Sequence, residues 1–213
     1  MTSTEYNNLM TWILMLVIAF VSGAIPFSVW LTRLFLKKDV RQFGDGNPGA
    51  INAFRSGSKL LGLVVLILDI CKAAIPVGIA YHQLDIRGLP MVLIAIAPVL
   101  GHAFSPFLKF NGGKAISTVL GSLIGVSLWQ ISLPAVIGAA LGIAFFTTTG
   151  WAIVVALIFG MSAIFIWFQD PLYFFVLLGV FLILCWTLRA DLSKPPQLRP
   201  WVRRFFSRSK TSQ

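Results

Sequence analysis

Long apolar runs separated by short polar segments constrain the fold of this chain more than any other feature. The runs cover residues 10–32, 60–81, 89–106, 115–131, 133–147, 150–168 and 172–188. A helix needs about 20 apolar residues to cross a hydrocarbon core about 30 Å thick, and it satisfies its own backbone hydrogen bonds there. The runs therefore predict an all-α integral membrane protein with about seven transmembrane helices. Because the fourth and fifth runs meet near residues 133–134 without a clear break, five or six helices is the alternative.

The charged residues support this interpretation and predict an orientation. Only 11% of the residues are charged, against about 25% in soluble domains. Positively charged loops stay in the cytoplasm, and with seven helices and an external N-terminus the inner segments hold 15 of the 17 Lys and Arg residues. We therefore expect the N-terminus outside and the C-terminus in the cytoplasm. The net charge of +10 lies in short connections and a terminal tail, so we expect membrane lipids, and no nucleic acid, as partners.

The chain divides into a polytopic membrane domain, residues 1–190, and a basic cytoplasmic tail, residues 191–213. Within the tail, residues 197–210 place Trp201, Val202, Phe205 and Phe206 on one helical side beside several arginines. This pattern is typical of an amphipathic helix at a membrane surface, and a disordered basic tail is the alternative. Both cysteines lie inside apolar runs and the sequence has no His/Cys cluster. We therefore expect no disulfide, no metal and no cofactor.

The first candidate site is a polar, glycine-rich loop at residues 44–55, with the sequence GDGNPGAINAFR. Successive glycines allow backbone N–H groups to converge on an anion. The side chains of Asn47 and Asn52 add donors, and Arg55 adds a charged fork. Phosphate is the expected ligand. An ordinary Asn-Pro-Gly turn is the alternative, although it leaves Asn52 and Arg55 unexplained.

The second candidate site is the segment at residues 101–115, GHAFSPFLKFNGGKA. Gly112, Gly113 and Lys114 precede a predicted helix, and a helix N-terminus favours anions. A lysine at the membrane interface after a turn is the alternative. His102 has a reference pKa suited to proton transfer, so it is a candidate base, with a hydrogen-bonded strut as the alternative.

Three further polar residues lie inside apolar runs. Asp69 and Lys72 are three residues apart in the second run, and charges inside a membrane are costly and usually paired. We expect this pair to brace the site, and direct catalysis is the alternative. Ser22 opens a segment with Gly23 and Pro26 that is typical of a kink or of close helix packing. The sequence has no GxSxG motif, so a serine nucleophile on an elbow is not indicated.

Together these segments resemble the acyl-phosphate:glycerol-3-phosphate acyltransferases of bacterial phospholipid synthesis, the PlsY family. The family pattern of GSIPFG, GSGNPGATNxxR, LDxxKG and GHxFPxFLxFxGGKG is matched in order by residues 22–27, 44–55, 68–72 and 101–114. The resemblance implies seven helices in the bacterial inner membrane and an active site facing the cytoplasm. It also implies acyl transfer from acyl phosphate to the 1-hydroxyl of glycerol 3-phosphate, giving lysophosphatidic acid and phosphate. A soluble enzyme that makes acyl phosphate is the implied partner.

The resemblance also implies roles for individual residues. The catalytic candidates are Arg55, Lys114, His102 and Asp45. The candidates for binding the donor phosphate are Gly46, Asn47, Gly49, Asn52, Gly112 and Gly113. The candidates for binding the acceptor phosphate are Arg55, Lys114 and Arg41. The residues expected to brace the site are Ser22, Asp69, Lys72 and Thr148.

The sequence departs from the family pattern at positions associated with the acceptor. Asp45 stands where the family has Ser, and Asp191 stands where the C-terminal HRxNI motif has Asn. The same motif has lost its His, because Leu188 occupies that position. Ala115 replaces a glycine, and a threonine run at residues 147–149 replaces a segment that contains serine. Transfer to a different polar acceptor and a catalytically silent, anion-binding membrane paralogue are therefore the alternative functions.

Overall fold

The computed structural model describes residues 3–209, which contain no β-strand and only one isolated bridge, between Phe146 and Leu198. The α-helices are α1 (Ser3–Ala24), α2 (Phe27–Leu36), α3 (Ala50–Arg55), α4 (Lys59–Gly78), α5 (Gly88–Ala103), α6 (Ile116–Ser127), α7 (Ser132–Phe145), α8 (Thr149–Trp167), α9 (Pro171–Thr187), α10 (Arg189–Leu192) and α11 (Pro200–Ser209). A π-helical segment, Ile79–Gln83, extends α4, and 3-10 turns occupy Val40–Gln42 and Pro106–Leu108. The predicted all-α class is confirmed.

Within the described part of the chain, four helical segments are long and apolar enough to cross a membrane: Asn8–Leu36, Lys59–Gln83, Gly88–Leu108 and Thr149–Trp167. The shorter apolar helices α6, α7 and α9 coincide with the other three predicted runs. The break between the fourth and fifth runs lies a few residues earlier than predicted, because Leu128 adopts a positive φ of 52° and ends α6. All seven apolar runs are therefore helical, and the number that crosses the bilayer stays a prediction.

The first run is interrupted at Pro26, where α1 ends and α2 begins. Proline has no backbone N–H and interrupts the helical hydrogen-bond ladder. The carbonyl of Ile25 accepts a hydrogen bond from Lys72 Nζ at 2.9 Å, and Ser22 Oγ donates to the carbonyl of Lys72 at 2.7 Å. Lys72 thus satisfies a backbone carbonyl at the break, and Ser22 satisfies the Lys72 carbonyl, which has no helical donor because Pro76 lies four residues later. These two bonds join the kink to α4.

Glycines allow the main helix pairs to approach closely. The most extensive packing is between α1 and α5, between α4 and α6, and between α7 and α8. A Cβ atom at Gly101 of α5 would collide with the backbone of Phe20 in α1, and one at Gly121 of α6 would collide with Ile70 in α4. Small residues at crossing points are typical of membrane helices, whose association depends on close van der Waals packing.

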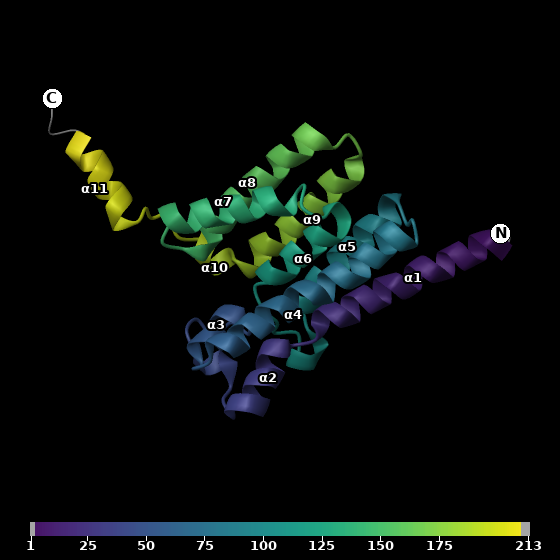
Figure 1. The fold of residues 1–213 in the computed structure, drawn as a ribbon, viewed down its shortest axis with the longest axis horizontal. Helices are drawn as coiled ribbons and strands as arrows, with labels where there is room; N and C mark the ends of the chain where they lie inside the picture. Colours follow the sequence, from purple (N-terminus) through teal and green to yellow (C-terminus); the bar gives the residue numbers. More distant parts are fainter. Residues whose placement is uncertain (1–2, 210–213) are drawn as a thin grey trace.

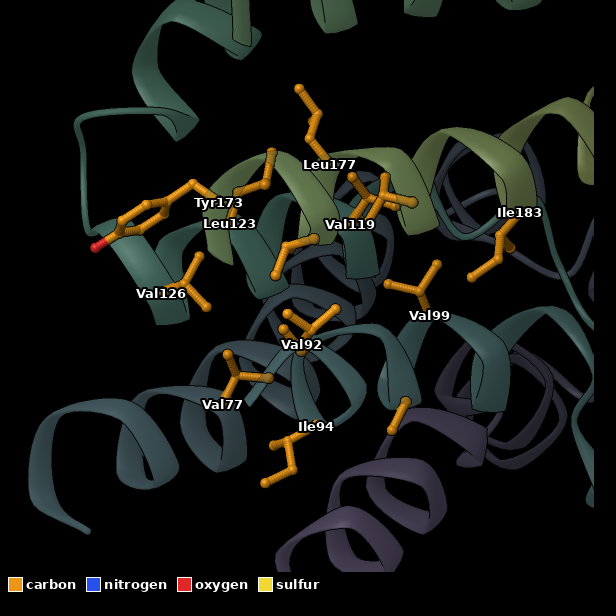
Figure 2. Close-up of a cluster of buried hydrophobic side chains, with 14 of the residues drawn as sticks. Val77, Val92, Ile94, Val99, Val119, Leu123, Val126, Tyr173, Leu177 and Ile183 are labelled. Carbon is orange, nitrogen blue, oxygen red and sulfur yellow. The ribbon is translucent and has the colours of Figure 1, made fainter. Parts of the chain in front are cut away.

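The buried core lies where α4, α5, α6 and α9 meet. Figure 2 shows buried apolar side chains of this core from the four helices, among them Val77 of α4, Val92 of α5, Leu123 of α6 and Leu177 of α9. The same packing places the last turn of α5, the segment before α6 and the end of α9 at one end of the bundle. This arrangement positions the site described below.

The two termini lie toward opposite ends of the long axis of the molecule, with α3, α10 and α11 at the end away from the N-terminus (Figure 1). The predicted helix in the tail is present as α11. Its first turn contacts the end of α7, where Trp201 Nε1 donates to the carbonyl of Ala144 at 3.0 Å. Trp201 and Phe205 remain exposed, and their contact with a membrane stays a prediction.

Candidate active site

The glycine-rich loop folds around the side chain of Asn52. Gly44 and Gly46 adopt positive φ values of 60° and 75°, which glycine reaches without a Cβ penalty. Asn52 is buried in the first turn of α3, and its Nδ2 donates to Asp45 Oδ1 at 2.8 Å and to the carbonyl of Asn47 at 3.0 Å. The sequence therefore specifies a closed loop with Asp45 and Asn47 held on one side.

The second segment turns back beneath the end of α5. The N–H groups of Gly112 and Gly113 donate to the carbonyls of Ala103 and His102, both at 3.1 Å. A Cβ at Gly112 would collide with the carbonyl of His102, so only glycine allows the chain to pass this close. Lys114 follows directly, and α6 begins two residues later.

The two segments meet through Asn47 and Lys114. The backbone N–H of Lys114 donates to Asn47 Oδ1 at 2.8 Å. Its side-chain Nζ lies 3.0 Å from Asp45 Oδ2 and 3.0 Å from Asp191 Oδ2. Asp191 lies on α10, so three segments that are distant in the sequence converge on one ammonium group.

A cavity of about 400 Å³ lies beside Lys114 and has a mixed polar and apolar lining. Its charged walls come from Arg41, Asp45, Lys114 and Arg189. The remaining lining residues are Gly46, Asn47, Pro48, Ala103, Phe104, Phe110, Asn111, Gly112, Gly113, Trp186 and Thr187. The size and charge of this cavity suit a small anionic ligand with an apolar portion.

Electrostatic contacts keep the ion pair charged. Burial opposes ionisation of Asp45, but hydrogen bonds from Lys114 and Asn52 outweigh it, so the pKa of Asp45 lies below its usual range. Burial likewise opposes the charge of Lys114, but the carboxylates of Asp45 and Asp191 outweigh it and raise its pKa. The contribution of Asp45 to folding stability is lost only as the pH falls through its lowered pKa. The contribution of Lys114 is lost only as the pH rises through its raised pKa. The pair is therefore charged throughout the neutral range.

The two arginines of the cavity have different surroundings. Arg41 donates to both carboxylate oxygens of Asp39, with an Nη2–Oδ2 distance of 2.7 Å. The hydrogen bond to Asp39 is the main cause of a raised pKa at Arg41. The guanidinium of Arg189 lies 4.6 Å from the ring centre of Trp186 and donates to the Trp186 carbonyl. Arg189 thus brings a charge to the cavity without a carboxylate contact among the described ion pairs.

Some predicted site residues line the cavity and others do not. Arg41, Asp45, Gly46, Asn47, Gly112, Gly113 and Lys114 line it. Arg55 lies outside this lining and is exposed, where its Nη1 donates weakly to Asn52 Oδ1 at 3.4 Å. Gly49 and the buried Asn52 are also not part of the cavity lining. The geometry therefore gives Arg55 and Asn52 contacts within the loop in place of the expected contacts with a ligand.

The expected cradle of backbone N–H groups is not available in this structure. The N–H groups of Gly46, Gly112 and Gly113 donate to the carbonyls of Phe43, Ala103 and His102, and those of Asn47 and Gly49 donate to Asp45 Oδ1 and the Asn47 carbonyl. Glycine is thus required here for tight turns and close chain crossings, and the ligand-facing charge comes from side chains.

The predicted bracing pair is buried and connects three helices. The side chains of Asp69 and Lys72 are each 2% exposed, with a distance of 2.7 Å between Lys72 Nζ and Asp69 Oδ1. Lys72 Nζ also lies 2.9 Å from His102 Nδ1 and donates to Ile25. His102 is buried, and a Cβ at Gly113 would collide with its Nε2 atom. His102 therefore packs against Gly113 of the second segment and does not line the cavity.

Thr148 precedes α8, and its Oγ1 atom is buried with no hydrogen-bond partner identified among the described residues. The lining residues outside the sequence candidates include Trp186 and Arg189. For Arg189, the available signal was the C-terminal motif of the family, in which the arginine persists beside the altered positions.

Within residues 3–209, His, Cys, Asp and Glu side chains form no group of three that could hold a metal ion.

Comparison with protein families extends the match beyond the four motifs. The family model described as glycerol-3-phosphate acyltransferase matches residues 13–195. The glycerol-3-phosphate acyltransferase of Streptococcus gordonii is 30% identical over 200 residues, covering 89% of this chain and 93% of the relative. The enzyme of the same name from Enterococcus faecalis is 41% identical over 115 residues, covering 54% of this chain and 52% of the relative. In that alignment and in others like it, the chain spans about half the length of the curated relatives it matches.

Two crystal structures share the fold. One is described as PlsY (YgiH), an integral membrane glycerol 3-phosphate acyltransferase, in its glycerol 3-phosphate form. It has a TM-score of 0.78 and 24% identity, and the match covers 92% of this chain and 99% of that chain. The lysophosphatidic acid form has a TM-score of 0.76 and 25% identity, covering 86% of this chain and 90% of that chain. These matches confirm the resemblance and the integral membrane architecture. The chain therefore belongs to the glycerol-3-phosphate acyltransferase family.

Proposed function

We propose that this protein transfers a fatty acyl group from acyl phosphate to the 1-hydroxyl of glycerol 3-phosphate, giving lysophosphatidic acid and inorganic phosphate for bacterial phospholipid synthesis. The observation that carries this proposal is the position of Lys114. Its ammonium group faces a charged cavity, while the helix that follows it lines an apolar one. The family membership supports the same substrates.

The apolar cavity suits the acyl chain. Its lining comes from α4, α6, α7, α8 and α9 and is almost entirely apolar. Ile116 and Ser117, directly after Lys114 and Ala115, form part of this lining, and Leu184 of α9 forms another part. An acyl chain in this cavity would place its activated carbonyl near Lys114, at the boundary with the polar cavity. The two cavities thus separate the lipid part of the reaction from its phosphate part.

The chemistry needs little from the protein beyond binding and positioning, because acyl phosphate is an activated mixed anhydride. The 1-hydroxyl oxygen attacks the acyl carbon, the bond from that carbon to the phosphate oxygen breaks, and the electron pair leaves with the phosphate. We propose that Arg41, Lys114 and Arg189 hold the acceptor phosphate and that the Asn47 amide contacts the donor phosphate. The hydroxyl proton passes to Asp45 or to the departing phosphate, since both face the cavity.

We further propose seven transmembrane helices with the N-terminus outside, the C-terminus inside and the active site at the cytoplasmic face. The helices α3, α10 and α11 lie at the end of the bundle away from the N-terminus (Figure 1), and they carry Arg55, Arg189 and the arginines of the tail. Arg189 of α10 also lines the polar cavity, which supports this orientation. A soluble acyl-phosphate-making enzyme would then reach the site from the cytoplasm. On the same side, α11 would lie at the inner leaflet with Trp201 and Phe205 in the headgroup region.

His102 offers a test of how the proton is handled. Its Nδ1 faces Lys72 and its ring is buried away from the cavity. We therefore expect His102→Gln, whose amide oxygen can accept from Lys72, to lower the turnover number less than about tenfold. A general base contributes about 10²–10⁴-fold. A loss of that size in a folded variant, with the acid limb of the pH–rate profile removed, would restore His102 as the base.

The proposed function is tested with purified protein and palmitoyl phosphate. We expect phosphate release and formation of lysophosphatidic acid only when glycerol 3-phosphate is present. Glycerol and a phosphate-free amino alcohol serve as alternative acceptors in parallel reactions. No release with any acceptor would contradict an enzymatic function, and release with an alternative acceptor alone would contradict the proposed substrate.

A further inference from the structure

One ammonium group in the candidate active site is held by two carboxylates. Lys114 Nζ lies 3.0 Å from Asp45 Oδ2 and 3.0 Å from Asp191 Oδ2. We call these three residues the Lys114 clamp. The two aspartates stand where the family motifs have Ser and Asn, so two separate departures converge on the same atom. The sequence separates Lys114 from Asp191 by 77 positions, and the packing of α9 against α6 and of α10 against α8 and α9 brings them together.

The charges around the cavity show what the clamp does to an anionic ligand. Asp39 already pairs with Arg41, and the clamp places two negative charges against the single positive charge of Lys114. Arg189 is the remaining cation of the lining. A phosphate approaching Lys114 therefore meets two carboxylates that occupy its hydrogen-bonding positions and repel it.

We infer that Asp45 and Asp191 are specificity-determining residues which together lower the affinity of this site for the phosphate of the acceptor. The inference rests on the proposed function. Each carboxylate alone is close enough to neutralise Lys114, so removing one leaves the other in place. Specificity can be set by unfavourable contacts as well as by favourable ones. In the Lys114 clamp, the unfavourable contact is between the acceptor phosphate and the carboxylates of Asp45 and Asp191.

The inference predicts a coupled effect of two substitutions. The variants are Asp45→Ser, Asp191→Asn and the double variant, with Asp45→Asn as a form that retains an acceptor for Asn52. Titration calorimetry with glycerol 3-phosphate, in the absence of donor, measures the dissociation constant directly. We expect each single variant to tighten binding about two- to threefold and the double variant to tighten it at least about tenfold, more than the product of the singles, because residues in contact are not additive. The KM for palmitoyl phosphate should stay within about twofold, since the donor is assigned to other groups.

Asp85→Asn is the matched control. It removes the same charge, but Asp85 is 83% exposed and pairs with Arg87 at the opposite end of α4. Asparagine tolerates the positive φ of 50° at this position. We expect no change in the dissociation constant for glycerol 3-phosphate from this control.

Three results would overturn the inference: additive effects of the two substitutions, no tightening in the double variant, or equal tightening in the Asp85→Asn control. The proposed function fails differently, through the absence of acyl transfer by the unmodified protein. An enzyme that transfers the acyl group normally but binds glycerol 3-phosphate equally well in all variants contradicts the clamp alone.

Discussion

Replacing Lys114 with alanine is expected to reduce acyl transfer at least about 10²-fold, the magnitude typical of losing one charged or hydrogen-bonding group that stabilises a transition state. Lys114 is one of three cationic residues that line the polar cavity, with Arg41 and Arg189, and it lies two residues before α6. Without it, Asp45 and Asp191 would repel the phosphate of the acceptor. The measurement is the steady-state rate of palmitoyl transfer to glycerol 3-phosphate by purified protein.

Lys59→Ala provides the control for this experiment. Lys59 is the exposed first residue of α4 and does not line the polar cavity, so the same substitution there should leave transfer within about twofold. The backbone N–H of Lys114 still donates to Asn47 in the alanine variant, and we therefore expect the two loops to remain joined. Turnover in Lys114→Ala that matches the Lys59→Ala control would remove Lys114 from the reaction.

Replacing Lys72 with methionine is expected to destabilise the protein by about 3–5 kcal/mol, because it leaves the buried charge of Asp69 without its partner. The side chains of both residues are 2% exposed. The change also removes the donors to the Ile25 carbonyl and to His102 Nδ1, so the kink between α1 and α2 loses a contact. Reversible unfolding in mixed micelles, followed by helical circular dichroism, measures the free energy of unfolding.

The double variant Lys72→Met with Asp69→Leu separates charge from packing. Replacing both partners by apolar residues of similar volume often restores stability, so we expect the double variant to be more stable than Lys72→Met alone. The corresponding exposed substitution, Lys59→Met, should change the free energy of unfolding by less than about 0.5 kcal/mol. A Lys72→Met variant as stable as this control would mean that the buried pair does not brace the bundle.

Several features were predicted from the sequence because they depend on neighbouring residues. The apolar runs predicted the helices, since the length of a run and the backbone hydrogen bonds of its helix are local properties. The pairing of Asp69 with Lys72 follows from the spacing of three residues on a helix. The kink at Pro26 follows from the missing N–H of proline. The four motifs were sufficient to indicate the family.

Other features depended on contacts between distant segments. In the sequence, Arg55 and Lys114 are equally candidates for binding the acceptor phosphate. Helix packing leaves Arg55 exposed outside the cavity lining and brings Lys114 to the cavity. His102 was a candidate base with a hydrogen-bonded strut as the alternative, and its position against Lys72 depends on the crossing of α4 and α5. The glycine N–H groups were expected to face a ligand, but close contacts between chain segments use them internally.

The sequence alone determined that this chain forms apolar helices, carries two glycine-rich polar segments and belongs with a family of membrane acyltransferases. The tertiary structure decided which charges meet. Asp45 and Asp191 looked like two independent departures in the sequence, and the packing of three segments makes them partners of one lysine. The physical reason is that helix formation follows from local composition, whereas the electrostatics of a site depends on distances between segments that only the packed helices fix.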